Sequence, residues 1–144
     1  MESLLQGVNI VAYKKNNKMY GMTCAWATHV DYKELILLLG SQSDTGNNLE
    51  VGDIIGVSSL GLKNKDLALH FGEKHSSSFD KFKGIKYTLD GNAILFPNTH
   101  TNFVCEVIKV SHPLSSEEDN LVEAKVLSEV INNEAKFLSM DDMN

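Results

Sequence analysis

The chain of 144 residues has no arginine, only two cysteines and two prolines, and no long hydrophobic run. Phosphate neutralisation needs a clustered basic face, and guanidinium groups are the usual readers of bases and phosphates, so the composition argues against a nucleic-acid partner. The longest apolar run, Leu35 to Leu39, is far too short to cross a bilayer, and we expect no membrane association.

Cys24 and Cys105 lie far apart and belong to no C-x-x-C pair or Cys/His cluster. Two free thiols in a reducing compartment are the simplest interpretation, so we expect a soluble, cytoplasmic protein. The five histidines are scattered without the spacing of a metal-binding motif, which predicts no metal site. No G-x-S-x-G motif occurs, and no catalytic residue can be assigned from residue type and spacing.

The net charge of −6 is unevenly distributed. Lysines and acidic residues are equal in number over residues 1–112, and all of the excess negative charge lies in residues 113–144. A solvated strand or helix face is the simplest explanation of this acidic segment.

Short segments rich in Val, Ile, Tyr and Thr, bounded by Gly, Asn or Asp, recur along the chain. They predict strands at Val8–Tyr13, Met19–Cys24, Leu35–Leu39, Ile54–Ser58, Ile85–Leu89, Ala93–Phe96 and Phe103–Val110. Hairpin turns are predicted at Lys14–Lys18 and Asp90–Asn92, because Asn and Gly tolerate positive φ. The sequence therefore predicts one domain, residues 1–144, with a mainly β fold: an antiparallel, Greek-key-like barrel with short peripheral helices.

Two short helices are predicted from their end signals. Asn64 is expected to cap a helix over Lys65–Phe71 that stops at Gly72. A second is expected between Asp44 and Gly52, with Leu49 buried. A loop or single helical turn is expected at residues 76–82, and for residues 121–131 the periodicity leaves strand and helix both open.

Two polar or small-residue runs could cooperate in holding a ligand. In Gly21–Thr28, small side chains surround Trp26 and would let a flat ligand approach the backbone, although Trp26 taken alone is more typical of a core residue. In Gly40–Thr45, hydroxyls and amides could converge on a phosphate, with Asp44 turned away as a helix cap. Without arginine, a phosphate charge must be met by hydroxyls, amides or a lysine.

Five motifs in order resemble the flavin reductase-like family of FMN-binding split β-barrels, most clearly over residues 7–110. They are Gly21-Met22-Thr23 followed by Thr28, Ser43-x-Thr45 with Asn48-Leu49, Leu67-Ala68-x-x-Phe71-Gly72, Asp80-Lys81-Phe82, and Val104-Cys105-Glu106-Val107.

The resemblance implies a homodimer of split barrels with FMN, rather than FAD, in a groove near the subunit interface. It implies a site in three parts. The isoalloxazine ring and ribityl chain would lie along Thr23, Cys24, Ala25, Trp26, Ala27 and Thr28, mainly through backbone groups. The phosphate would be held by Ser41, Gln42, Ser43 and Thr45. Phe79, Lys81 and Phe82 would lie near the open face of the ring.

One departure from the family bears on activity. Family members that reduce free flavin with NAD(P)H commonly carry Gly-Asp-His, and the corresponding residues here read Glu118-Asp119-Asn120, so the histidine is missing. The first hypothesis is an FMN-binding oxidoreductase, an NAD(P)H-dependent flavin reductase-like enzyme, fed with electrons by NAD(P)H or a partner protein. The alternatives are an FMN electron carrier without a nicotinamide site, and a non-catalytic split-barrel binding module.

Overall fold

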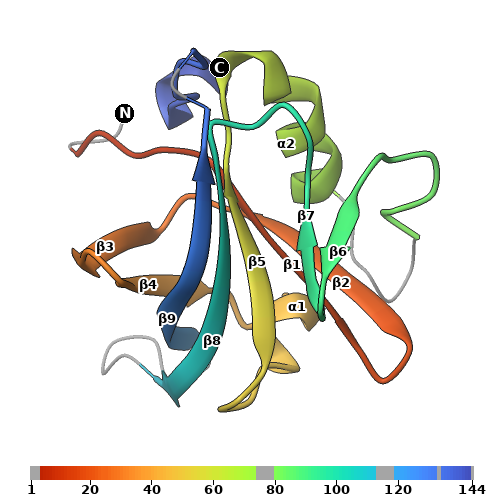
Figure 1. Cartoon of the computed structure of the whole chain (residues 1–144), viewed down its shortest axis with the longest axis vertical. Helices are drawn as coiled ribbons and strands as arrows, with labels where there is room; N and C mark the ends of the chain where they lie inside the picture. The colour runs from red at the N-terminus through yellow and green to blue at the C-terminus, as the bar shows by residue number, and fades with distance from the viewer. Residues whose placement is uncertain (1–3, 74–79, 113–118, 133, 144) are drawn as a thin grey trace.

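Nine strands, each antiparallel to its neighbours, form a single curved sheet in the computed structural model, which describes residues 4–73, 80–112, 119–132 and 134–143 (Figure 1). The strands are β1 Asn9–Lys15, β2 Lys18–Cys24, β3 Ala27–Asp31, β4 Glu34–Leu39, β5 Ile54–Ser59, β6 Thr88–Asp90, β7 Ala93–Leu95, β8 Thr101–Ser111 and β9 Asn120–Ile131. Their order is β3-β4-β9-β8-β5-β1-β7-β6, and β2 pairs with the other edge of β1 along its whole length. The predicted mainly β class with few helices is confirmed.

The two predicted hairpins are present. Asn16 and Asn17 connect β1 to β2 with φ of 53° and 64°, the left-handed conformation that a tight two-residue turn requires. Gly91, with φ of 59°, lies in the turn between β6 and β7.

The acidic C-terminal part contains the strand that the sequence left open. In β9, the inward positions Val122, Ala124 and Val126 are buried and alternate with more exposed residues, which is the period of a strand. After β9, the chain passes beside Leu60, the residue that follows β5. There the Leu138 amide donates to the Leu60 carbonyl, and Leu138 is fully buried. A 3₁₀ turn at Met140–Met143 follows. Within the described part of the chain, no helix has the length and apolar character needed to span a bilayer.

Three secondary-structure elements differ from the prediction. Strand β3 was not predicted, because its residues are mostly exposed and show no apolar alternation; it forms because it pairs with β4. The strand expected at Ile85–Leu89 is wrong: only β6, at Thr88–Asp90, is extended, and Ile85 packs on the core from a loop. The helix expected to reach Gly52 ends early, since α1 spans Asp44–Asn47, although Leu49 is buried as predicted.

The second helix, α2, spans Lys65–Glu73 and runs through Gly72 rather than stopping there. Asn64 does not cap it; its side-chain oxygen accepts from the Gly61 amide and closes the preceding 3₁₀ turn, Leu62–Asn64. The apolar stripe of α2 is buried as predicted, with Phe71 packed edge-on against Phe82 and Phe96. In Figure 1, α2 covers one end of the sheet and α1 lies toward the other.

One close approach between two strands requires a glycine. The carbonyl of Ile94, in β7, lies directly over Gly56, in β5, so closely that a β-carbon at Gly56 would overlap it. Neither group is the flexible end of a side chain, so the two strands would have to separate to admit a methyl group.

We expect Gly56→Ala to lower the free energy of unfolding by about 2–4 kcal/mol through this overlap, measured by urea denaturation. Gly72→Ala is the matched control: its β-carbon would lie 3.6 Å from the Thr23 β-carbon, an ordinary contact, and alanine favours the helix. The control should be as stable as the wild type or more so, whereas a Gly56→Ala protein of wild-type stability would contradict the packing assigned to β5 and β7.

Candidate functional site

The ammonium group of Lys81 is buried, and the side chain is only 4% exposed. Its Nζ donates to the Gly21 carbonyl at the middle of β2 (2.8 Å) and to the Phe71 carbonyl near the end of α2 (3.1 Å). The His70 Nε2 in turn donates to the Lys81 carbonyl (2.7 Å), which fixes the turn that carries the lysine. Burial lowers the pKa of Lys81 to about 8, and the negative charge of Asp44 offsets part of this effect.

Lys81 opens on a cavity of about 200 Å³, which we call the lysine cavity. Its polar lining consists of Thr23, Gln42, Ser43, Asp44, Thr45 and Lys81. Three of the four residues predicted to hold a phosphate are therefore brought together beside the lysine. The fourth, Ser41, does not line the cavity, and its amide donates to the Asp119 carboxylate (2.8 Å).

Ser43, not Asp44, is the N-cap of α1. The Ser43 hydroxyl accepts from the Gly46 amide (3.1 Å) and lies 2.9 Å from the Met22 sulfur. Thr45 is buried, and its carbonyl accepts from the hydroxyl of Tyr13 in β1 (2.6 Å). A short surface segment has few contacts that fix its position. The bonds of Ser43 and Thr45 attach the segment around α1 to β1 and β2.

The start of β9 supports the same loop. Asn120, which the predicted resemblance aligns with the family histidine, is buried, and its side-chain amide donates to the Asn47 side-chain oxygen (2.9 Å). The side-chain amide nitrogen of Asn47 in turn donates to the Ser41 carbonyl (2.7 Å). Asn120 therefore holds α1 in place.

The residues predicted to line the flavin ring are spread between two cavities. Thr23 lines the lysine cavity with its hydroxyl donating to the Ala68 carbonyl (2.6 Å), while Ala27 and Thr28 line a second and larger cavity. Between them, Trp26 is 57% exposed, so the interpretation of Trp26 as a core residue is wrong. Among the described strands β3 is the first in the sheet order, so one of its edges has no strand partner and offers backbone groups to a ligand.

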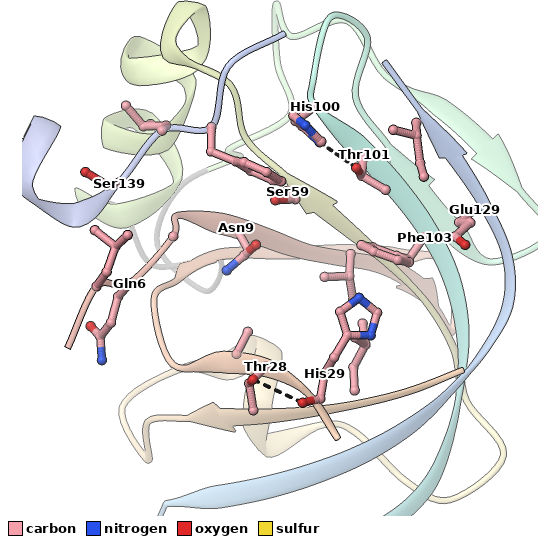
Figure 2. A pocket seen from close by; sticks show the side chains of 18 residues that line it. Gln6, Asn9, Thr28, His29, Ser59, His100, Thr101, Phe103, Glu129 and Ser139 are labelled. Carbon is pink, nitrogen blue, oxygen red and sulfur yellow. Dashed lines mark hydrogen bonds between the residues drawn. The ribbon is translucent and has the colours of Figure 1, made fainter. Parts of the chain in front are cut away.

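The larger cavity, which we call the hollow, has a volume of about 530 Å³. Its walls come from β3, the ends of β5, β8 and β9, and the segments near both chain termini (Figure 2). Two histidines reach it: His29 packs edge-on to Phe103 at 5.6 Å, and His100 stacks on Phe137 at 3.6 Å between ring centroids.

Several predicted site residues lie elsewhere. Phe82 is buried in the aromatic core under α2, so its side chain is not at a surface that a flavin ring could reach. Ala25 lines neither cavity, and Cys24 is a buried thiol. Phe79 lies outside the described residues. Lys81 lines the lysine cavity together with the hydroxyl residues.

Sequence reasoning missed part of each cavity. Met22, Phe71 and Gly72 line the lysine cavity but were not predicted as site residues. All three belong to the motifs that resemble the family, and this could have identified them. The histidines of the hollow carried no such signal, because its walls come from segments far apart in the sequence. Within the described residues, no cluster of three or more His, Cys, Asp or Glu side chains could hold a metal ion.

The structure is thus an antiparallel barrel with few helices, and one of its cavities is lined by hydroxyl side chains and the ammonium group of Lys81. The chain belongs to the family described as flavin reductase like domain, whose model matches residues 1–141, and the predicted resemblance is confirmed. Membership supports a flavin-binding oxidoreductase function.

Solved structures from this class have the same fold. The NADH:FAD oxidoreductase of Streptomyces globisporus C-1027 has a TM-score of 0.84 at 16% identity, covering 94% of this chain and 81% of that one. An FMN-binding protein from Thermus thermophilus with bound 1-cyclohex-2-enone gives 0.81 at 12% identity, with 92% and 74% covered. Flavoredoxin from Methanosarcina acetivorans gives 0.80 at 11% identity, with 93% and 73% covered. No curated protein sequence matches the chain significantly.

The two thiols are expected to be unreactive in the folded protein. Burial raises the pKa of Cys24 to about 12, although a hydrogen bond with the Trp26 backbone lowers it in part, and burial raises the pKa of Cys105 to about 12. Since the thiolate is the reactive form, a chromogenic disulfide reagent at pH 8 should label neither cysteine until denaturant is added, and should then label both. Rapid labelling of native Cys24 would contradict the burial of its thiol.

Proposed function

We propose that this protein is an FMN-binding oxidoreductase that holds the phosphate of FMN in the lysine cavity. The observation that supports this most directly is the buried ammonium of Lys81. The ion pairs among the described residues involve Lys15 and Lys109, and none involves Lys81, whose bonds go to two neutral carbonyls. A buried cation of this kind is stabilised by an anionic ligand.

The size and lining of the cavity favour the phosphate end of FMN. Its volume of about 200 Å³ is below the range of roughly 300–1,000 Å³ typical of whole-ligand pockets. The hydroxyls of Ser43 and Thr45 and the side chain of Gln42 line the space beside Lys81 and supply the neutral donors that the absence of arginine makes necessary. FMN is therefore proposed over FAD, whose additional nucleotide would have to leave the cavity.

The flavin ring is proposed to lie along Cys24–Thr28, with the free edge of β3 supplying backbone hydrogen bonds to it. When bound, the flavin supplies the electron-transfer chemistry, and the protein supplies position and electrostatics. NAD(P)H or a partner protein is the proposed electron source. Lys81 is proposed as a phosphate ligand, in place of its predicted role at the open face of the ring.

A second candidate function is an FMN electron carrier without a nicotinamide site. The observation that favours it is Asn120, which occupies the position of the family histidine. Its side chain is buried and bonded to Asn47, so it is not presented to a second reactant.

We further propose that the protein is a cytoplasmic homodimer. Both cysteines are free and buried, as in a reducing compartment. Large apolar side chains are exposed along the β2–β4 region, including Trp26 and Tyr32, and Tyr32 is 92% exposed. Exposed large apolar side chains that gather in one region are typical of subunit contacts.

The phosphate assignment is tested by comparing FMN with riboflavin, which lacks only the phosphate. We expect FMN to bind about 10- to 100-fold more tightly, as measured by flavin fluorescence titration, because the phosphate gains a charge-assisted bond to Lys81. The preference should fall as pH rises through about 8, where the unliganded lysine loses its proton.

Lys81→Met should abolish the preference for FMN, whereas Lys83→Met, at an exposed position two residues away, should leave it unchanged. Circular dichroism spectra identical to wild type would show that both variants fold. If Lys81→Met left the ratio of FMN affinity to riboflavin affinity unchanged, the assignment of the FMN phosphate to the lysine cavity would be wrong.

The visible spectrum of the FMN complex separates the two candidate functions. For a nicotinamide-dependent reductase, anaerobic NADH or NADPH should bleach the flavin band within minutes, as dithionite does. For the electron carrier, only dithionite should bleach it, because Asn120 cannot replace the missing histidine. A protein that stays colourless after incubation with excess FMN would contradict both candidate functions and favour the non-catalytic binding module.

A further inference from the structure

The hollow is a second cavity of ligand size, distinct from the lysine cavity. Its volume of about 530 Å³ lies within the range of small-molecule sites. Much of its wall is apolar, with Leu35, Val57 and Phe103 inside and Ile131 and Phe137 nearer the rim. Ala27 and Thr28, where the proposed flavin run ends, form part of the same wall. A molecule bound here would therefore lie beside the flavin ring.

The charges around the hollow exclude a phosphorylated ligand. Among the described residues that line it there is no lysine, and the one carboxylate is that of Glu129, on β9. A phosphate group would enter a largely apolar space with no ammonium group and one negative charge to meet it. The ligand class that fits is small and uncharged.

Two side chains in the hollow present hydrogen-bond acceptors. The Asn9 amide nitrogen donates to the Cys24 carbonyl (3.1 Å), so its oxygen is the group left for a ligand. The His29 Nδ1 lies 3.1 Å from the Asp31 carbonyl, which only accepts, so Nδ1 carries the hydrogen and Nε2 is the acceptor of the neutral ring. Figure 2 shows both side chains extending from different strands toward the same space. An aromatic ring that carries a hydroxyl donor matches these walls.

We propose that the hollow binds a small, uncharged phenol, as the second ligand of the protein beside the flavin. Its role as second ligand rests on the proposed function, but binding to the hollow itself does not require FMN. The aromatic ring packs between Phe103 and the apolar side chains of β5 and β9, and the hydroxyl donates to Asn9 or His29.

The test uses three probes of similar shape with the full chain, first without FMN and then with it. They are p-cresol, 4-methylanisole, in which a methyl group replaces the hydroxyl hydrogen, and phenyl phosphate. In NMR titrations we expect p-cresol to shift amides around the hollow, such as those of His29, Phe103 and Ile131, while Gln42 and Ser43 stay unchanged. The anisole should bind about tenfold more weakly because it cannot donate, and phenyl phosphate should not bind in the hollow.

Variants then locate the site. His29→Phe keeps an aromatic ring but removes the acceptor, and should reduce the advantage of p-cresol over the anisole. Ile131→Asp places a carboxylate in the apolar wall and should weaken p-cresol by about tenfold or more. Val130→Asp is the matched control: it is the adjacent, exposed residue of β9, does not line the hollow, and should change the affinity less than twofold.

Three results would overturn the proposal: equal affinity for p-cresol and the anisole, shifts at the lysine cavity instead of the hollow, or equal loss of affinity in both aspartate variants. Sedimentation of the same samples adds a fourth. If wild type is a dimer, Ile131→Asp a monomer, and p-cresol binds neither, the hollow is covered by a second copy of the chain. Failure of the flavin proposal is distinguishable, because it would appear as unchanged FMN fluorescence while p-cresol still bound.

Discussion

The Lys81 ammonium lies between the Gly21 carbonyl of β2 and the Phe71 carbonyl of α2, and these two bonds join three segments that are distant in the sequence. Removing an ammonium group from water is costly, and neutral carbonyls repay that cost only in part, which is why its pKa is lowered. The barrel therefore keeps a cation in a partly compensated state beside a cavity. A core built for stability alone would place an apolar side chain there, and the proposed anionic ligand would account for the lysine.

The same constraint explains why the loop around α1 is so heavily bonded. Ser43 and Thr45 are useful to an anion only if they stay beside Lys81, yet a four-residue helix has little stability of its own. Tyr13 from β1 and Asn120 from β9 supply the missing support through bonds to Thr45 and Asn47. Asn120 thus stabilises the geometry of the cavity from β9, through its bond to Asn47.

Much of the fold was predictable because its signals are local. The Asn16-Asn17 turn, the short apolar strands and the five ordered motifs each depend on neighbouring residues, and they were enough to give the family. Strand β3 was not predictable, since its exposed residues are extended only because β4 lies beside them. The burial of Lys81 was also hidden: residue type places a lysine at the surface, and only the meeting of β2 with α2 removes it from water. Apart from Ala27 and Thr28, the hollow had no sequence signal, because its walls come from strands and terminal segments that are far apart in the sequence.

Charge divides the two cavities more clearly than shape does. All the excess negative charge of the chain lies in residues 113–144, and β9 carries two of these acids, Glu123 and Glu129. Glu129 is exposed and also lines the hollow, where no described lysine opposes it. The lysine cavity is also lined by one carboxylate, that of Asp44, but there the ammonium group of Lys81 balances it. An anionic group and an uncharged ring would therefore sort between the two spaces by electrostatics. The run from Thr23 to Thr28, which touches both, is the part of the chain along which a molecule with a phosphate at one end and a ring at the other would lie.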